Sequence, residues 1–551
     1  MSRYGISVVV ALLLVPAAVS SADLPQQPRI HVSTRLVEIG VIVRDKNGAV
    51  ANLTQDDFTV VDRGKPQQIT IFYADAAAAA QQPPLQPLPQ NTFSDVPHFG
   101  AAAPRSVTIV LLDNLNTLYG TSAGSQYETT PYWLENLALQ NGRMHLIEFI
   151  KTLDPRDRVA IYGLRNTLHV LCDFTCDRTQ LLAVLKNYDT TSITNRQVVE
   201  PGHSIGPRSA GGASDGFENG ASARLASAAN EDRAIETMAA LQQIAAHVTN
   251  IPGRKNLVWL TANLPFSGAA MAHVLAPADI AVYPIDARGL LARSPMVMAD
   301  ITGTADAQEV GPDEIHSIQL DSAPAQSAQP VGITTMEQLA DETGGQPFVN
   351  TNDLTGAIRK AVEDSAVTYT LGFYINRDAL DGKFHEIKVE VRGKGLTLRY
   401  PKGYFGYPDT APTKDEGQQM VETALQSPIE SSVISLQATL ARVSQPEANS
   451  LNLSCSIDIR NLQLVQAGNL RKGAVIVYVI EEDQTGKVIF QWDKGYNFQI
   501  TDAQYAALLK SGMLFHQNLH PKAGVTTLRV VVQDPSTNDL GSLIIPLSQV
   551  N

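Results

Sequence analysis

The chain has 551 residues, a formal net charge of −13 and 44% hydrophobic residues. At roughly 150 residues per domain, this length predicts about three domains, and the apolar content is ample for sizeable cores. The negative charge argues against nucleic acid as a partner. Only three cysteines occur, so the fold is not a disulfide scaffold.

The N-terminus has the pattern of an export signal. Arg3 supplies a positive charge, an apolar stretch follows from Ile6 to Val19, and small residues at 20–22 suit cleavage. We therefore expect residues 1–22 to be removed and the mature protein to be periplasmic or secreted. The alternative is a membrane anchor, but the apolar run is shorter than the about 20 residues that span a bilayer. We expect no transmembrane segment after signal cleavage.

Short β-strands are predicted over residues 28–74. Apolar and polar side chains alternate from Val37 to Arg44, and an Asp-Lys-Asn-Gly turn follows at 45–48. This stretch alone is marginal as an independent domain. Residues 75–104 are rich in Ala, Gln and Pro, a composition typical of a linker.

From residue 105 to 366, predicted strands alternate with predicted helices. Strands are expected at 107–112, 158–164, 256–261 and 280–285, and helices at 132–152, 231–249, 335–343 and 353–366. This alternation predicts a doubly wound, mostly parallel α/β sheet with helices on both faces. Two insertions, 188–230 and 301–331, exceed ordinary connection lengths and are predicted to be binding loops or disordered.

After the α/β unit, the strand pattern returns. We expect residues 367–406 to complete a β-sandwich begun by residues 28–74, so that the α/β unit is inserted into it; separate small sheets are the alternative. Residues 407–429 are predicted to be a second linker. Residues 430–551 contain further strands, which predict a C-terminal antiparallel β-sandwich with a protein-binding or spacer role.

The most informative residues follow the first strand of the α/β unit. The apolar run ends at Asp113, and the small polar residues Asn114, Asn116 and Thr117 come directly after it. Open α/β sheets bind ligands at the carboxyl ends of their strands. The sequence therefore predicts that this strand end presents oxygen atoms to a ligand or a metal.

With these elements placed, the chain resembles a von Willebrand factor type A domain. More narrowly, it is similar to the acidobacterial von Willebrand factor A-related family of exported proteins. The matching motifs occur in order over residues 30–406: 53–58, 109–117, 157–162, 252–260, 280–288, 339–345 and 402–405. The resemblance implies a von Willebrand A-like α/β domain flanked by all-β sandwich domains.

The general von Willebrand fold also implies a metal-ion-dependent adhesion site, whose first loop has the form Asp-x-Ser-x-Ser. Asp113 matches the Asp, Leu115 replaces the first Ser, and Thr117 can replace the second. Asn263 stands where a later acid is often found and offers a carbonyl oxygen without charge. Magnesium demands an octahedral shell of oxygen ligands. Two outcomes stay open: Mg²⁺ bound through Asp113 and Thr117, or a degenerate site with no cofactor.

Two other motifs contain residue types that can take part in chemistry. Cys172 and Cys176 flank three residues and predict either a local disulfide after export or free thiols, while zinc lacks a second Cys/His pair. The Gly-x-Ser-x-Gly pattern at 202–206 resembles a nucleophile motif. Its flanking residues form neither a good strand nor a good helix, so a secreted hydrolase using Ser204 is a weak hypothesis.

The leading functional hypothesis is an exported, non-enzymatic interaction or adhesion protein. Its partner would be a protein or a cell-surface ligand bound at the strand-end face. The predicted ligand-binding residues are Asp113, Asn114, Asn116, Thr117 and Asn263. The alternative is a structural component of a cell-envelope assembly without a metal.

Overall fold

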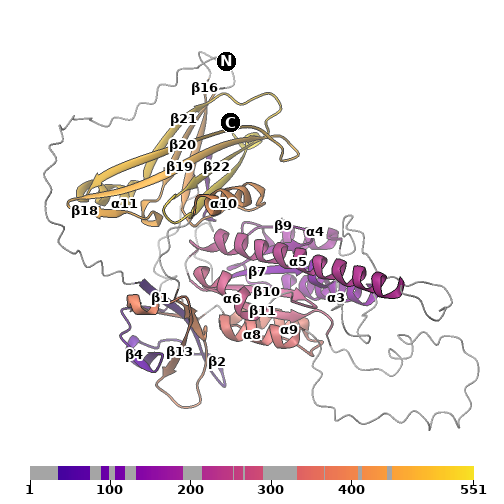
Figure 1. Cartoon of the computed structure of the whole chain (residues 1–551). Coiled ribbons are helices and arrows are strands. Elements are labelled where there is room, and N and C mark those ends of the chain that lie inside the picture. The colour runs from indigo at the N-terminus through magenta and orange to yellow at the C-terminus, as the bar shows by residue number, and fades with distance from the viewer. Residues whose placement is uncertain are drawn as a thin grey trace, which may run out of the picture.

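The computed structural model describes residues 35–74, 88–97, 106–117, 132–189, 214–251, 253–264, 267–289, 332–364, 367–406, 413–443 and 450–550. The predicted signal peptide (1–22), Ser204 and the predicted insertion at 301–331 lie outside these residues. The fold is sheet-rich and has several domains. Figure 1 shows a central α/β unit with a small β unit on one side and a larger β-sandwich on another.

The central sheet has the strand order β11-β10-β7-β8-β9. Its strands are β7 (Ser106–Asp113), β8 (Asp157–Leu164), β9 (Leu168–Cys172), β10 (Lys255–Thr261) and β11 (Ile280–Asp286). The first four in spatial order are parallel, and β9 pairs antiparallel with β8. Every residue of β10 is buried, as expected for an inner strand with both faces covered.

Helices cover both faces of this sheet. One face carries α5 (Ser214–Val248), α6 (Gly268–Leu275) and α8 (Ile333–Thr343). The other face carries α3 (Tyr132–Lys151), α4 (Arg178–Asn187) and α9 (Leu354–Asp364). The short helix α2 (Asn114–Thr117) directly follows β7. Among the described residues, no helix has the length and apolarity that crossing a bilayer would need.

The helix predicted at 231–249 begins earlier, at Ser214. The prediction of a loop or disorder over 188–230 is therefore wrong for its last part. The added segment contains Gly216 and Gly220, and glycine is a poor helix former. Local propensity thus underestimates a helix whose later turns pack on the sheet through Leu241, Ile244 and Val248.

The small β unit is built from strands on both sides of the α/β unit. One sheet has the order β14-β1-β12-β5, with β2 also paired to β1, and the other has the order β15-β13-β3-β4. These strands are β1 (Arg35–Asp45), β2 (Gly48–Ala49), β3 (Phe58–Asp62), β4 (Lys65–Gln67), β5 (Ile71–Ala74), β12 (Tyr369–Ile375), β13 (Phe384–Val391), β14 (Thr397–Arg399) and β15 (Gly403–Phe405). Because β1 pairs with β12 and β3 with β13, the two chain segments share one core.

Both predicted linkers contain regular structure. Within 75–104, β6 (Thr92–Ser94) pairs with β16 (Leu436–Val443) of the C-terminal sandwich. Asp95 fastens this strand, because its carboxylate accepts a hydrogen bond from the Leu436 backbone N–H at 2.9 Å. Within 407–429, α10 (Lys414–Gln426) forms behind a capping box at Thr413. Ala-, Gln- and Pro-rich composition does not reveal β6, because a three-residue strand is stabilised by the strand that it pairs with.

The C-terminal unit consists of two antiparallel sheets. One has the order β21-β17-β16-β6; in the other, β19 pairs with β18, β20 and β22, and β23 follows β22. The remaining elements are β17 (Ser450–Ile457), β18 (Val465–Ala467), β19 (Leu470–Glu482), β20 (Val488–Thr501), α11 (Asp502–Ser511), β21 (Met513–Leu519), β22 (Thr527–Gln533) and β23 (Leu540–Pro546). β17 ends at Ile457, because Asp458 caps a short 3₁₀ helix.

Candidate ligand site at the strand-end edge

Asp113 ends β7, and its side chain is fully buried. Its Oδ1 accepts a hydrogen bond from the Asn116 backbone N–H at 2.8 Å. Its Oδ2 accepts bonds from Asn116 Nδ2 and from the indole Nε1 of Trp259, both at 2.9 Å. Burial raises the pKa of Asp113, although these bonds oppose the shift. The carboxylate therefore ties the α2 turn to the neighbouring strand β10.

Asn114 and Asn116 belong to the same internal network. Asn114 Oδ1 accepts a hydrogen bond from the Tyr188 hydroxyl at 2.7 Å, and Asn116 Nδ2 also donates to Thr237 Oγ1 at 3.0 Å. Both asparagine side chains are buried. The structure thus brings three of the five predicted ligand-binding residues together, but it places their side chains in the interior.

The other two predicted residues lie differently. Asn263 is half-buried in the loop after β10, where its Oδ1 accepts a bond from the Leu264 backbone N–H at 2.9 Å. The side chain of Thr117 lies outside the described residues. A further acid, Asp286, ends β11 and is buried. Arg288 donates to both of its carboxylate oxygens at 2.9 Å, so this charge is neutralised locally.

Sequence reasoning misses Trp259 and Tyr188, which complete the network around the strand end. Trp259 lies 146 positions from Asp113 in the chain. Their contact depends on the parallel pairing of β7 with β10, in which Trp259 is the register partner of Leu111. The only available signal is a tryptophan near the end of a predicted buried strand, which by itself indicates core packing.

The carboxylate of Asp113 is directed at protein N–H donors, so a divalent cation would have to replace some of these bonds. Magnesium needs oxygen ligands with free lone pairs in octahedral geometry. Both oxygens of Asp113 already accept bonds from N–H groups, and the buried Leu115 carries no side-chain oxygen. Within the described ranges, no group of three His, Cys, Asp or Glu side chains could hold a metal ion.

Replacing Trp259 with phenylalanine should test the network directly. The change removes the indole donor from Asp113 Oδ2 but keeps an aromatic ring in the core. We expect the free energy of unfolding to fall by about 2–3 kcal/mol, because a hydrogen bond to a buried carboxylate is lost. Urea unfolding followed by circular dichroism measures the loss. Trp492→Phe, at a partly exposed tryptophan of the C-terminal sandwich, should lose less than about 1 kcal/mol; equal losses would contradict the assignment.

The cysteines divide into a bonded pair and a free thiol. A disulfide joins Cys172 and Cys176. Cys455 is buried in the core of the C-terminal sandwich, where burial raises the pKa of its thiol to about 12. The described structure therefore contains one reducible bond, at the end of β9.

Comparisons with known proteins give distant similarities. No known protein family and no curated protein matches the sequence. Among solved structures, an aerotolerance-related membrane protein from Bacteroides fragilis is 13% identical with a TM-score of 0.25, over 47% of this chain and 98% of that one. BatB from Bacteroides thetaiotaomicron gives the same values. Proximal thread matrix protein 1 of the mussel byssus, solved with a zinc-occupied MIDAS motif, is 12% identical with a TM-score of 0.24, over 48% of each chain. Similarities this distant assign no function.

Proposed function

We propose that this chain is an exported, non-enzymatic protein that binds a protein or cell-surface ligand at the carboxyl edge of its central sheet. The observation that carries the proposal is the alignment of strand ends. In the parallel pairing of β7, β10 and β11, residues 113, 261 and 286 finish at one edge. Ligands of open α/β sheets bind outside such an edge. The proposal also places the central unit in the doubly wound, von Willebrand A-like class.

The residues at this edge have different roles in the proposal. Asp113, Asn114 and Asn116 are buried, so they hold the loops in shape and do not touch the partner. Asn263 is half-exposed in the described structure, and it is the contact residue that we propose. A partner would thus recognise the surface of a strand end whose interior is fixed by hydrogen bonds.

We further propose that binding at this edge needs no divalent metal. The support is that N–H donors occupy both oxygens of Asp113. Calorimetric titration with millimolar Mg²⁺ should therefore give no binding heat. A saturable isotherm that disappears in Asp113→Ala would instead establish the magnesium site. This measurement separates the metal question from partner binding.

Export is supported by the disulfide between Cys172 and Cys176. Disulfides persist in oxidising compartments such as the periplasm and the extracellular space, and are rare in the cytosol. This agrees with the proposed signal peptide at residues 1–22. N-terminal sequencing of the protein recovered from a periplasmic or secreted fraction would test the cleavage site.

Site-specific cross-linking tests the proposed binding face. A photo-cross-linking residue placed at Asn263 in the mature chain should capture a discrete partner from envelope extracts. The matched control carries the same group at Lys388, an exposed position on β13 of the small β unit. Capture at 263 and not at 388 supports the proposal. Equal or absent capture at both positions favours a structural envelope component, and labelling of Ser204 by a fluorophosphonate would favour a hydrolase.

A further inference from the structure

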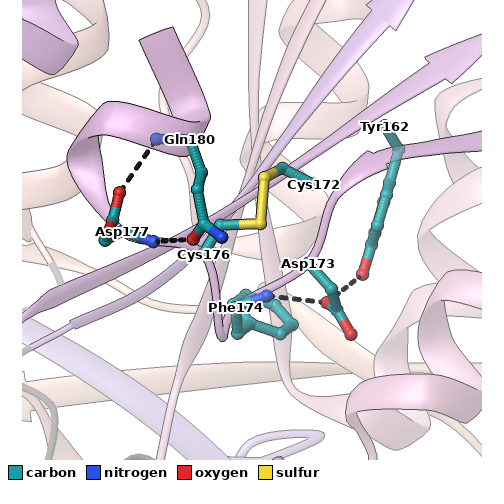
Figure 2. Close-up of a disulfide and its surroundings, with 7 residues drawn as sticks. All are labelled: Tyr162, Cys172, Asp173, Phe174, Cys176, Asp177 and Gln180. Carbon is teal, nitrogen blue, oxygen red and sulfur yellow. Dashed lines mark hydrogen bonds between the residues drawn. A yellow bond between two sulfur atoms is a disulfide. The ribbon is translucent and has the colours of Figure 1, made fainter. Parts of the chain in front are cut away.

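A short disulfide loop lies where the α/β unit meets the C-terminal sandwich. Cys172, the last residue of β9, is bonded to Cys176, and the loop encloses Asp173 and Phe174 (Figure 2). Asp173 Oδ1 accepts hydrogen bonds from the Phe174 backbone N–H and from the Tyr162 hydroxyl, both at 2.8 Å. The closed loop therefore holds one carboxylate in a defined direction.

His247, near the end of α5, faces this loop and is buried. Its Nε2 lies 3.3 Å from Asp173 Oδ2, and its ring stacks on Phe174 with centroids 6.2 Å apart. On the opposite side, its Nδ1 lies 2.8 Å from the backbone carbonyl oxygen of Glu430. An imidazolium, which carries protons on both nitrogens, donates to the Glu430 carbonyl through Nδ1 and forms an ion pair with Asp173 at Nε2, which makes no hydrogen bond to the described residues.

The charges around His247 favour that protonated form. Burial alone lowers the pKa of His247, but the Asp173 carboxylate and the Glu430 carbonyl outweigh it, and the pKa is raised above its usual value. Burial alone raises the pKa of Asp173, but His247 and Tyr162 outweigh it, and the pKa is lowered. The Glu430 carboxylate also faces this cluster, with Arg529 and Asp95 beyond it.

The C-terminal end of α5 and Asn250 just beyond it are also hydrogen-bonded to Ser432 and Ser435, in the segment that leads into the C-terminal sandwich. The Ser432 backbone N–H donates to the Ala246 carbonyl at 2.9 Å, and Ser432 Oγ donates to the His247 carbonyl at 2.9 Å. Asn250 Nδ2 donates to the Ser432 carbonyl and, at 2.9 Å, contacts Ser435 Oγ. The position of His247 is thus part of the joint between the two units.

We propose that the Cys172–Cys176 disulfide is a site of thiol–disulfide exchange that controls how firmly the C-terminal sandwich is held on the α/β unit. This inference is independent of the proposed ligand face. The reaction partner is a dithiol. Once the loop is open, Asp173 and Phe174 are no longer held beside His247, and the imidazolium loses its fixed counter-ion.

The exchange proceeds in two displacement steps. A thiolate of the dithiol attacks Sγ of Cys176, which is half-buried whereas Cys172 is buried. The sulfur–sulfur bond breaks, Cys172 leaves as a thiolate, and a mixed disulfide forms. The second thiolate of the reductant then displaces Cys176. Two electrons pass to the protein, the dithiol becomes a disulfide, and the two cysteine thiolates take up protons from solvent.

Amide hydrogen exchange, measured on the full mature chain, tests whether reduction of the disulfide loosens this joint. Treatment with dithiothreitol should accelerate amide exchange at Ser432 at least tenfold and leave the amides of β7 unchanged. The pKa of His247, followed by NMR, should fall on reduction. Asp173→Asn, which keeps the disulfide but removes the charge, should reproduce both changes in the oxidised protein. The double variant Cys172→Ser/Cys176→Ser is the control, since dithiothreitol should have no further effect on it.

Two results would overturn the inference. The first is an unchanged Ser432 exchange rate and an unchanged His247 titration after full reduction of the wild-type protein. The second is a uniform loss of protection that includes β7, because that would show global destabilisation and not release of a joint. Both are read from the wild-type chain, so the test remains decisive if the double variant does not fold.

The same joint should respond to pH in a defined direction. Because the folded-state pKa of His247 is raised, its stabilisation is complete below its unfolded value of about 6.5 and is lost as pH rises through the folded-state value. The pKa values of Glu430 and Asp95 are also raised, chiefly by burial, so their ionisation weakens the joint in the same direction. Ser432 protection, corrected for intrinsic exchange, should therefore decrease from pH 6 to pH 9. Constant protection over this range would contradict a role for the imidazolium.

Discussion

Replacing Asp364 with alanine is expected to lower the free energy of unfolding by about 3 kcal/mol. Asp364 ends α9 and is almost fully buried. Its carboxylate contacts Arg44 of β1 and Arg399 of β14, whose side chains are about three-quarters buried. The change leaves two guanidinium groups at the boundary between the α/β unit and the small β unit without their counter-ion.

The matched control is Glu363→Ala, at the exposed neighbouring position in the same helix. It removes the same charge from α9 without breaking a buried pair, and we expect a change within about 0.5 kcal/mol. Denaturant unfolding of both variants, followed by far-UV circular dichroism, measures the difference. If the two variants lose equal stability, the Arg44–Asp364–Arg399 cluster does not hold the two units together.

Replacing Arg529 with alanine should be as damaging to the C-terminal sandwich, with a loss of about 3–5 kcal/mol. Arg529 is buried on β22, and its Nε donates to Glu482 Oε1 at 3.1 Å. Its Nη1 donates to the carbonyls of Ala424 and Ser427 at 3.1 and 3.0 Å, at the end of α10. The substitution leaves a buried carboxylate unpaired and removes the donors that dock the helix on the sheet.

Arg471 provides the control within the same sheet. It pairs with Asp502, whose side chain is 60% exposed, while the Arg471 side chain is 30% exposed. Arg471→Ala should therefore lose no more than about 1 kcal/mol. Thermal unfolding followed by near-UV circular dichroism compares the two variants. Similar shifts in midpoint would mean that Arg529 contributes no more than a surface ion pair.

The order of strands and helices in the α/β unit follows from local sequence patterns. The predicted strand at 107–112 and helix at 132–152 agree with β7 and α3 to within a residue at each end. The strand is a continuous apolar run because both of its faces are buried. The helix has an apolar stripe because one of its faces packs in the core. β6 is different: its three residues carry no period of their own, and it exists because β16 offers a free edge.

At the candidate site, too, some features follow from local sequence and others depend on the tertiary structure. An apolar strand that stops at Asp113 indicates, from sequence alone, a special strand end. That pattern does not tell whether the carboxylate faces solvent or the interior. The orientation depends on the Trp259 indole and the Asn116 amide. Trp259 reaches Asp113 only through strand pairing, which brings together residues far apart in the chain.

Local composition and periodicity by themselves determined the alternating α/β unit, the β-rich regions on both sides of it, and the polar strand end at Asp113. Only the tertiary structure decided that Asp113 is enclosed, that Cys172 and Cys176 are bonded, and that His247 lies between their loop and Glu430. The physical reason is that periodicity reports which face of an element is buried, a property of neighbouring residues. Hydrogen bonds and ion pairs at a junction depend on register and docking between distant segments, which no local pattern encodes.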